Sequence, residues 1–276
     1  MDVFSADWLG ICRRAVAAQR KIFAATPSSE ERTVYEGVGE GGDHTLAIDR
    51  RCEDVVFAEL EMLAAQGASF VAVSEERGEV SFGSGGAARV VIDPIDGSLN
   101  ARRTIPSHSL SIAVASGSSM ADVEFGFVHD FGADEEFVAS RGGGASVGER
   151  TVAVSAGTEK LEVVGLESAE PDWSLPALEA LAGKAYRLRV VGSIAITASY
   201  VAAGRFDAMI SLRPCRSVDA AAAQLIVREA GGEVAFGELA LEEAALDLEA
   251  RYPIAAARDA TGLATVRAAQ VAAAAA

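Results

Sequence analysis

The segment from Arg89 to Asn100 constrains the fold more than any other part of this chain. Val90–Ile92 is a short apolar run of the kind that buried strands show, and a proline follows two residues later. Because proline has no N–H to donate, we expect Pro94 to end the strand and Asp93 and Asp96 to lie on the turn beyond it. The sequence therefore predicts two carboxylates three residues apart at the end of a buried strand.

The residues that follow can bind an anion. Gly97 permits a close backbone approach, and the N–H groups of Gly97, Ser98 and Leu99 can open a helix whose positive end faces a negative group. Two hard oxygen ligands beside such a turn indicate Mg²⁺ held between protein and phosphate. The alternative is an ordinary type I turn with an aspartate as helix cap, and this segment alone leaves both interpretations open.

Length and charge limit the class of protein. With 276 residues, half of them hydrophobic, the chain can form one large domain or two moderate ones. Its formal net charge of −16 argues against a nucleic-acid partner or an acidic membrane surface, because such binders rely on basic patches. A phosphate substrate would be repelled by this charge unless divalent cations neutralised it locally.

The N-terminal stretch Phe4–Ala25 has apolar residues at helical spacing with charges between them, so we expect an amphipathic helix rather than a signal peptide. No apolar run approaches the length of a membrane span. Cys12, Cys52 and Cys215 are far apart and lack metal-ligand spacing. We therefore expect reduced thiols in a cytoplasmic protein.

The pattern of the chain changes near its middle. Short alternating runs between residues 107 and 141 predict an antiparallel meander, preceded by helices at 4–25 and about 45–65. After the glycines at 142–144, strands and helices alternate. We expect an α+β half at residues 1–150 with an antiparallel sheet and an α/β half at 151–276, with a soft boundary. The expected strands of the second half are 161–166, 188–191, 206–212 and 252–256, and its helices are 193–203, 219–230 and 260–272.

Three further acidic positions acquire meaning from their place in the chain. Glu75 and Glu76 follow the β-branched run Val71–Val73, so two strand ends that bear acids can converge. Asp219 opens a helix, and Asp49 lies within one. The ordinary alternatives are a solvated turn, a helix cap and an exposed helix residue respectively.

Five motifs in order resemble those of the inositol monophosphatase superfamily. The run Asp93-Pro94-Ile95-Asp96-Gly97-Ser98 is similar to its aspartate-proline-x-aspartate-glycine-threonine/serine signature, and the resemblance covers about residues 5 to 260. The other four motifs are Ile48-Asp49 with Glu53, Ser74-Glu75-Glu76, Val191-Gly192-Ser193, and Val218-Asp219-Ala220-Ala221 followed by Leu225 to Gly232.

The resemblance implies a layered αβαβα sandwich and a Mg²⁺-dependent phosphatase. Glu75, Asp93 and the main-chain carbonyl of Ile95 would hold a first Mg²⁺. Asp93 would bridge to a second ion that is also bound by Asp96 and Asp219. A third, weaker ion near Glu75 would give two or three ions in all.

The resemblance also implies the catalytic roles. Ser98 stands where the family has threonine, and with Asp49 it would orient and deprotonate the attacking water, while Glu75 completes the catalytic set. The N–H groups of Gly97 and Ser98 would hold the phosphate. The residue types suit the hydrolysis of a phosphate monoester, because carboxylates can hold two metal ions. Two metal ions can neutralise the charge on the phosphate oxygens, activate a water molecule and stabilise the leaving alkoxide.

The substrate side departs from the inositol-specific pattern. The turn at Gly192, Ser193 and Ala195 is expected to face the substrate, but the stretch before Asp219 lacks the acid that grips ring hydroxyls and carries Arg213 and Arg216. Either arginine can reach a second phosphate through its guanidinium fork, or both are ordinary surface arginines. The stretch Ser98-Leu99-Asn100-Ala101 with Ile105-Pro106 resembles archaeal-type members that also hydrolyse fructose 1,6-bisphosphate.

The sequence therefore predicts a phosphomonoester hydrolase of the inositol-1-phosphate type. A sugar bisphosphatase is the main alternative, and a phosphatase for 3′-phosphoadenosine 5′-phosphate is less favoured because no adenine pocket signature is present. A regulatory or binding homologue is disfavoured, since every expected metal position carries a competent side chain. The resemblance further implies a homodimer that acts on a small phosphorylated polyol or sugar.

Overall fold

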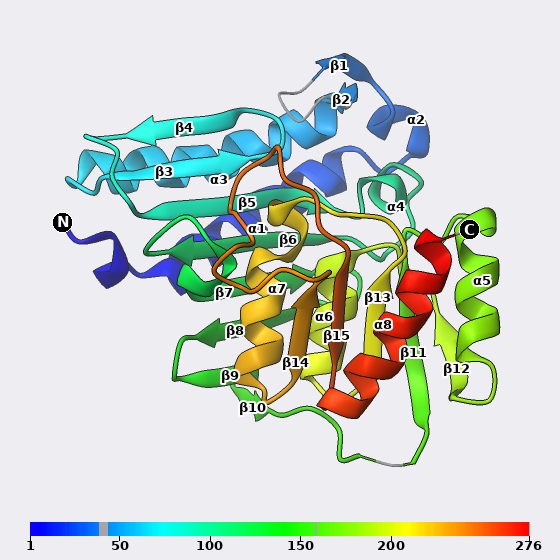
Figure 1. The fold of residues 1–276 in the computed structure, drawn as a ribbon. Helices are drawn as coiled ribbons and strands as arrows, with labels where there is room; N and C mark the ends of the chain where they lie inside the picture. The colour runs from blue at the N-terminus through cyan, green and yellow to red at the C-terminus, as the bar shows by residue number, and fades with distance from the viewer. Residues whose placement is uncertain (39–43, 158, 276) are drawn as a thin grey trace.

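Two large sheets and three helical layers make up the described part of the molecule, beside a small two-stranded sheet, β1-β2 (Figure 1). The computed structural model describes residues 1–38, 44–157 and 159–275. Helices cover the outer face of each sheet, and two more helices lie between the sheets. This order confirms the predicted αβαβα sandwich.

The first sheet has eight strands in the order β10-β9-β8-β7-β6-β5-β3-β4. Neighbouring strands are antiparallel, except that β3 and β5 run parallel. The antiparallel run β6-β7-β8 confirms the predicted meander. The strands are β3 (Phe70–Ser74), β4 (Gly78–Phe82), β5 (Arg89–Asp96), β6 (Ser109–Ala115), β7 (Val123–Asp130), β8 (Glu135–Ser140), β9 (Gly144–Val147) and β10 (Arg150–Val152).

Helices α1 (Trp8–Ala25) and α3 (Ala47–Ala65) cover the outer face of this sheet, and both confirm predicted helices. Their apolar stripes bury large side chains such as Phe57 and Leu60 against the sheet. At about 25 cal/mol per Å² of apolar surface, each such side chain contributes roughly 1.5–3 kcal/mol. The three cysteines are buried and unpaired.

The second sheet has five strands in the order β12-β11-β13-β15-β14. β11 is parallel to β12 and β13, whereas β15 is antiparallel to β13 and β14. β12 begins three residues earlier than expected, and β14 is a strand that the sequence did not indicate. The strands are β11 (Leu161–Glu167), β12 (Ala185–Arg189), β13 (Ala208–Ser211), β14 (Glu233–Phe236) and β15 (Ile254–Ala257).

Helices α6 (Ile194–Ala202) and α7 (Ser217–Glu229), which confirm the helices predicted at 193–203 and 219–230, lie between the sheets. Both are apolar around their circumference because both sheets pack on them, and the buried alanines at 220–223 let α7 approach the first sheet closely. Helices α5 (Pro171–Leu181) and α8 (Ala260–Ala274) cover the outer face of the second sheet. The remaining short elements are η1 (Val3–Ser5), α2 (Ser29–Arg32), β1 (Tyr35–Val38), β2 (His44–Leu46), α4 (Ser98–Arg102) and η2 (Met120–Asp122).

The prediction that Pro94 ends the strand is wrong. β5 continues to Asp96, and Asp93 and Asp96 pair with Ser111 and Ser109 of β6 across a shift in register. The parallel partner β3 stops opposite Ile92, so the second edge of β5 is open from there on. Proline is tolerated in such an irregular, one-sided segment because its missing N–H interrupts no ladder bond.

Within the described residues, helices of sufficient length and apolar character to cross a lipid bilayer are absent.

Candidate active site

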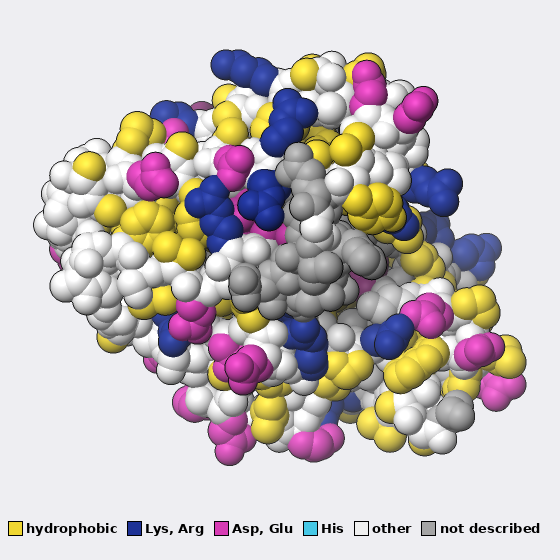
Figure 2. Space-filling model, turned by 90° about the horizontal axis from the view of Figure 1, so that it is seen from above, with side chains coloured by type: hydrophobic (Ala, Val, Ile, Leu, Met, Phe, Trp, Pro, Cys, Tyr) yellow, Lys and Arg dark blue, Asp and Glu magenta, His cyan; other side chains and the backbone are white. Residues whose placement is uncertain are grey.

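The parallel pair β3 and β5 brings acidic residues from two parts of the chain together. Ser74 is paired with Ile92, so Glu75 and Asp93 leave the same edge of the sheet. They open onto a pocket of about 110 Å³. Its lining residues are Asp49, Glu75, Glu76, Asp93, Pro94, Ile95 and Ser98. On the face shown in Figure 2, a recessed group of acidic atoms lies between basic side chains.

Asp49 belongs to the first turn of α3, because the helix begins at Ala47. Its side chain is buried, so the interpretation as an exposed helix residue does not hold. Oδ2 accepts a hydrogen bond from the Leu46 N–H at 3.3 Å, whereas no described donor reaches the buried Oδ1. Burial, together with the charges of Glu76 and Glu75, raises the pKa of Asp49 to about 7.

Asp93 is 2% exposed and lies deepest in the acidic group. Its Oδ1 accepts a hydrogen bond from the Ile95 N–H at 2.9 Å, which fixes the carboxylate against the strand end. Burial raises the pKa of Asp93 well above its usual range, and the neighbouring charges of Glu75, Asp96 and Asp219 raise it further. A cation at this point would relieve both effects.

Asp96 faces the N-terminus of α6. Its carboxylate accepts hydrogen bonds from the Ser193 hydroxyl and from the Ala195 and Ile194 N–H groups at 2.7 and 3.4 Å. Burial raises the pKa of Asp96 to about 6 although these donors act in the opposite direction. The expected substrate-side residues Ser193 and Ala195 therefore donate to Asp96 in this structure.

Arg216 connects two of the expected metal ligands. Its guanidinium forms an ion pair with Glu75, and its N–H donates to Asp219 Oδ2 at 2.8 Å. Asp219 is the third residue of α7, because the helix begins at Ser217 rather than at the aspartate. Burial and the charge of Asp96 raise the pKa of Asp219 to about 6.

Gly97 lies between β5 and α4 and requires glycine. Its φ is +91°, and a Cβ there would lie 2.9 Å from the carbonyl oxygens of Gly192 and Ser107. The turn places the exposed Ser98 at the start of α4, on the wall of the acidic pocket. Ser98 therefore shares the pocket with Asp49, Glu75 and Asp93.

A second, open pocket of about 800 Å³ adjoins the acidic one at Asp96. Gly192 and Arg213 line it, whereas Arg216 is not among its lining residues. The Arg213 guanidinium is paired with Glu170 at 2.6 Å and lies 5.4 Å from the Trp173 ring centroid. The two arginines that the sequence grouped together therefore face different parts of the site.

Two buried glutamates support the site and received no role from the sequence. Glu53 accepts hydrogen bonds from the Ser74 hydroxyl at 2.6 Å and from the Arg77 N–H and Nε at 3.2 and 3.1 Å, so it holds the turn that carries Glu75. Glu167 holds the turn before α6. The available signal for Glu53 was its spacing of four residues from Asp49, which puts both on one face of α3.

The expected ligands Glu75, Asp93, Asp96 and Asp219 are of types that bind Mg²⁺, but their side chains do not converge on one point in this structure. Among the described residues, no three acidic, cysteine or histidine side chains form a group that could hold a metal ion. Asp96 is directed toward α6, and Glu75 toward Arg216. The donors are nevertheless all hard oxygens, and burial together with the charges of Glu75, Asp96 and Asp219 raises the pKa of Asp93, which a cation would reverse.

Solved structures share this architecture. An inositol monophosphatase-fructose 1,6-bisphosphatase superposes with a TM-score of 0.83 at 25% identity, covering 96% of this chain and 100% of that one. An extragenic suppressor protein from Bartonella henselae gives a TM-score of 0.79 at 27% identity, covering 96% of this chain and 98% of that one.

Sequence comparisons agree with the structural ones. The chain is 30% identical over 260 residues to the fructose-1,6-bisphosphatase/inositol-1-monophosphatase of Methanothermobacter thermautotrophicus, covering 91% of each. It is 34% identical over 200 residues to the inositol-1-monophosphatase of Mesorhizobium japonicum, covering 70% of this chain and 72% of that one. The model of the inositol monophosphatase family matches residues 10–274. The chain therefore belongs to the inositol monophosphatase family and is a phosphomonoesterase.

Proposed function

We propose that this chain hydrolyses the phosphate monoester of a small polyol, with inositol 1-phosphate as the first candidate. The observation that carries the proposal is the convergence of Asp49, Glu75 and Asp93 on one pocket beside the glycine turn at 97, next to a larger pocket reached at Asp96. Carboxylates, an anion-binding turn and room for an alcohol are the parts that metal-assisted phosphate hydrolysis needs.

The metal roles are part of the proposal. Members of the family depend on Mg²⁺. Glu75, Asp93 and the Ile95 carbonyl would hold one Mg²⁺, and Asp93, Asp96 and Asp219 a second, with a third near Glu75 at high concentration. Bound Mg²⁺ supplies positive charge to the phosphate oxygens and lowers the pKa of a water molecule.

The protein residues hold the substrate and move the proton. Asp49 is suited to accept a proton through the Ser98 hydroxyl, because its Oδ1 has no described donor and both residues line the acidic pocket. The N–H groups of Gly97 and Ser98 would hold the phosphate. Gly192 and Arg213 line the larger pocket and would contact the alcohol part of the ester.

Fructose 1,6-bisphosphate is the second candidate. Relatives whose names join both activities support it, and Arg213 lies on the wall of the larger pocket. Glu170 already balances the charge of Arg213, so a second phosphate would have to displace an exposed ion pair worth about 1 kcal/mol or less. Arg216 pairs with Glu75 and is better placed to act on the metal side. A homodimer remains a prediction.

Phosphate release from inositol 1-phosphate, fructose 1,6-bisphosphate and 3′-phosphoadenosine 5′-phosphate, measured in parallel with and without Mg²⁺, tests the proposal. We expect Mg²⁺-dependent release with the highest kcat/KM for inositol 1-phosphate. Faster hydrolysis of the bisphosphate would transfer the proposal to the second candidate, and no release from any ester would contradict it.

A further inference from the structure

The turn at residues 191–193 joins β12 to α6 and lies between two buried carboxylates. Glu167, the last residue of β11, is 1% exposed. Its Oε1 accepts hydrogen bonds from the Val191 N–H at 3.2 Å and the Thr197 hydroxyl at 2.6 Å, and its Oε2 accepts from the Gly192 N–H at 2.9 Å. Glu167 thus binds two main-chain donors of the turn and ties them to the first part of α6.

Asn100 of α4 binds the same turn through its carbonyl groups. Its Nδ2 donates to the Val191 and Ser107 carbonyls, each at 2.8 Å. Gly192 has a φ of +84°, and a Cβ there would lie 2.5 Å from Asn100 Nδ2. Glycine is therefore required at position 192 for Asn100 to reach the turn. Glu167 holds the turn at two N–H groups, and Asn100 holds it at the Val191 carbonyl.

The residues after the turn direct their own donors at Asp96. The Ser193 hydroxyl and the Ala195 and Ile194 N–H groups all point to its carboxylate. Ser193 Oγ also lies 3.2 Å from Ser109 Oγ of β6. These three donors belong to consecutive residues at the end of the turn and the start of α6. A rotation of residues 191–193 would therefore move all three relative to Asp96.

We propose that Glu167 and Asn100 are positioning residues that orient Asp96 through the turn at 191–193. The inference rests on the proposed function of Asp96 as a metal ligand. Hydrogen bonds to a ligating carboxylate, and the groups that hold those donors in place, commonly change metal affinity or activity by about 10- to 100-fold when removed. In this role, Glu167 and Asn100 act through the turn and do not contact the metal ion or the phosphorus atom.

The E167Q variant tests this role. Its amide would keep one acceptor but present an NH₂ group to the Gly192 or Val191 N–H, so the turn must shift. We expect the dissociation constant for Mg²⁺ alone, measured by calorimetry, to rise by about 10- to 100-fold. At saturating Mg²⁺, kcat should fall, and KM for inositol 1-phosphate should change as well, because the shifted turn carries Gly192, which lines the larger pocket.

Asp207→Asn is the matched control. Asp207 is a buried carboxylate at the same sheet that accepts hydrogen bonds from the main-chain N–H groups of Glu162 and Val163 and from Arg258, away from the acidic pocket. We expect this variant to lose stability without a change in Mg²⁺ affinity. A purely structural role for Glu167 would give the two variants the same behaviour.

A second variant and a crystal structure keep the inference testable if E167Q folds poorly. Asn100→Ala removes the carbonyl-side contact from a partly exposed position, and we expect a weaker effect in the same direction. A crystal structure of either variant should show the Asp96 carboxylate displaced. Unchanged Mg²⁺ affinity, or an Asp96 that superposes on the wild type, would overturn the inference. If no ester is hydrolysed even by the wild type, the proposed function fails, but the position of Asp96 still decides this inference.

Discussion

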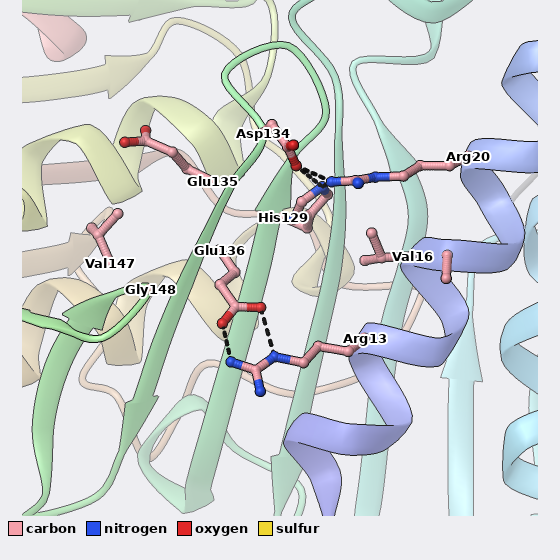
Figure 3. Close-up of a pocket in the computed structure, with 10 residues that line it drawn as sticks. Arg13, Val16, Arg20, His129, Asp134, Glu135, Glu136, Val147 and Gly148 are labelled. Carbon is pink, nitrogen blue, oxygen red and sulfur yellow. Dashed lines mark hydrogen bonds and ion pairs between the residues drawn. The ribbon is translucent and has the colours of Figure 1, made fainter.

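Two acidic clusters in this molecule differ in how their charges are balanced. In a groove of about 580 Å³ between α1 and the β7–β8 turn, arginines from α1 reach across to the acids of the sheet (Figure 3). Arg13 pairs with Glu136 and Arg20 with Asp134, while Glu135 points away from α1 and pairs with Arg205 at 2.6 Å. In the acidic pocket, by contrast, Arg216 pairs with Glu75, whereas the described donors to Asp49 and Asp93 are the main-chain N–H groups of Leu46 and Ile95.

The pKa values follow this difference. Hydrogen bonds from Arg13 and Arg205 lower the pKa of Glu136 and Glu135. Burial raises the pKa of Asp49 to about 7, and burial with like charges raises that of Asp93 well above its usual range. Acids with a permanent arginine partner stabilise the fold, whereas acids left to repel one another are suited to a cation that can be exchanged.

Asp93→Asn should separate the two clusters most sharply. Asp93 is the expected bridge between two metal ions, so its loss removes their shared ligand, and we expect kcat/KM to fall by several orders of magnitude. Stability in the absence of Mg²⁺ should not fall, because a buried charge among like charges is removed. Phosphate release and chemical denaturation measure the two effects. Near-normal Mg²⁺-dependent turnover would contradict the assignment.

Asp49→Asn should have the next largest effect. The amide cannot accept the proton of the attacking water, so we expect kcat to fall by about 10²- to 10⁴-fold with little change in KM. Mg²⁺ affinity should change much less than in Asp93→Asn, because Asp49 is not an expected ligand. Steady-state kinetics over a Mg²⁺ series would distinguish the two variants, and an equal loss of metal affinity would assign Asp49 to the metal instead.

Mg²⁺ alone should stabilise the wild type through the acidic pocket. At a free concentration 100 times the dissociation constant, a ligand specific for the native state adds about 2.7 kcal/mol to the free energy of unfolding. We expect a rise in Tm with Mg²⁺ that a sodium salt of equal ionic strength does not give. The rise should be much reduced in Asp93→Asn and retained in Glu136→Gln, and a rise of equal size in both would place the cation elsewhere.

The sequence was informative where a site rests on local patterns and failed where it rests on distant partners. The motif from Asp93 to Ser98 and the strand that ends just before Glu75 were predictable, because short runs define them. The role of Pro94 was not, since only the end of β3 opposite Ile92 makes a proline acceptable there. α5 was missed because Pro176 lies inside it and interrupts its helical pattern.

The contacts of the two supporting glutamates were not predictable for the same reason, although Glu53 belongs to a motif with Asp49. Glu53 binds a turn 21 to 24 residues away, and Glu167 binds one 24 to 25 residues away. No periodicity links such positions in a single sequence. The donors that direct Asp96 toward α6 likewise lie 97 to 99 residues away in the chain, so only the folded structure reveals them.

His129 at the groove predicts a pH effect on stability. Burial, with the charge of Arg20, lowers its pKa from 6.5 to about 4. As the pH falls below 6.5, the unfolded chain takes up a proton at His129 that the native protein does not. The contribution of neutral His129 to the free energy of unfolding is therefore complete above pH 6.5 and is lost as the pH falls toward 4. We expect at most about 2 kcal/mol between pH 7 and 5, and a flatter profile in His129→Phe by urea denaturation. Equal slopes would exclude His129 as the source.

Breaking the Arg13–Glu136 pair should have the smallest effect. The pair is exposed on the arginine side, with 53% of that side chain accessible, so Arg13→Met should lower the free energy of unfolding by about 1 kcal/mol or less and less still at high salt. Phosphate release and Mg²⁺ affinity should stay at wild-type values, because no metal has to replace this arginine. A variant that lost activity without losing stability would show that the groove acts on the site. The groove acids, which arginines neutralise, could then no longer be separated in function from the pocket acids, which an exchangeable cation would neutralise.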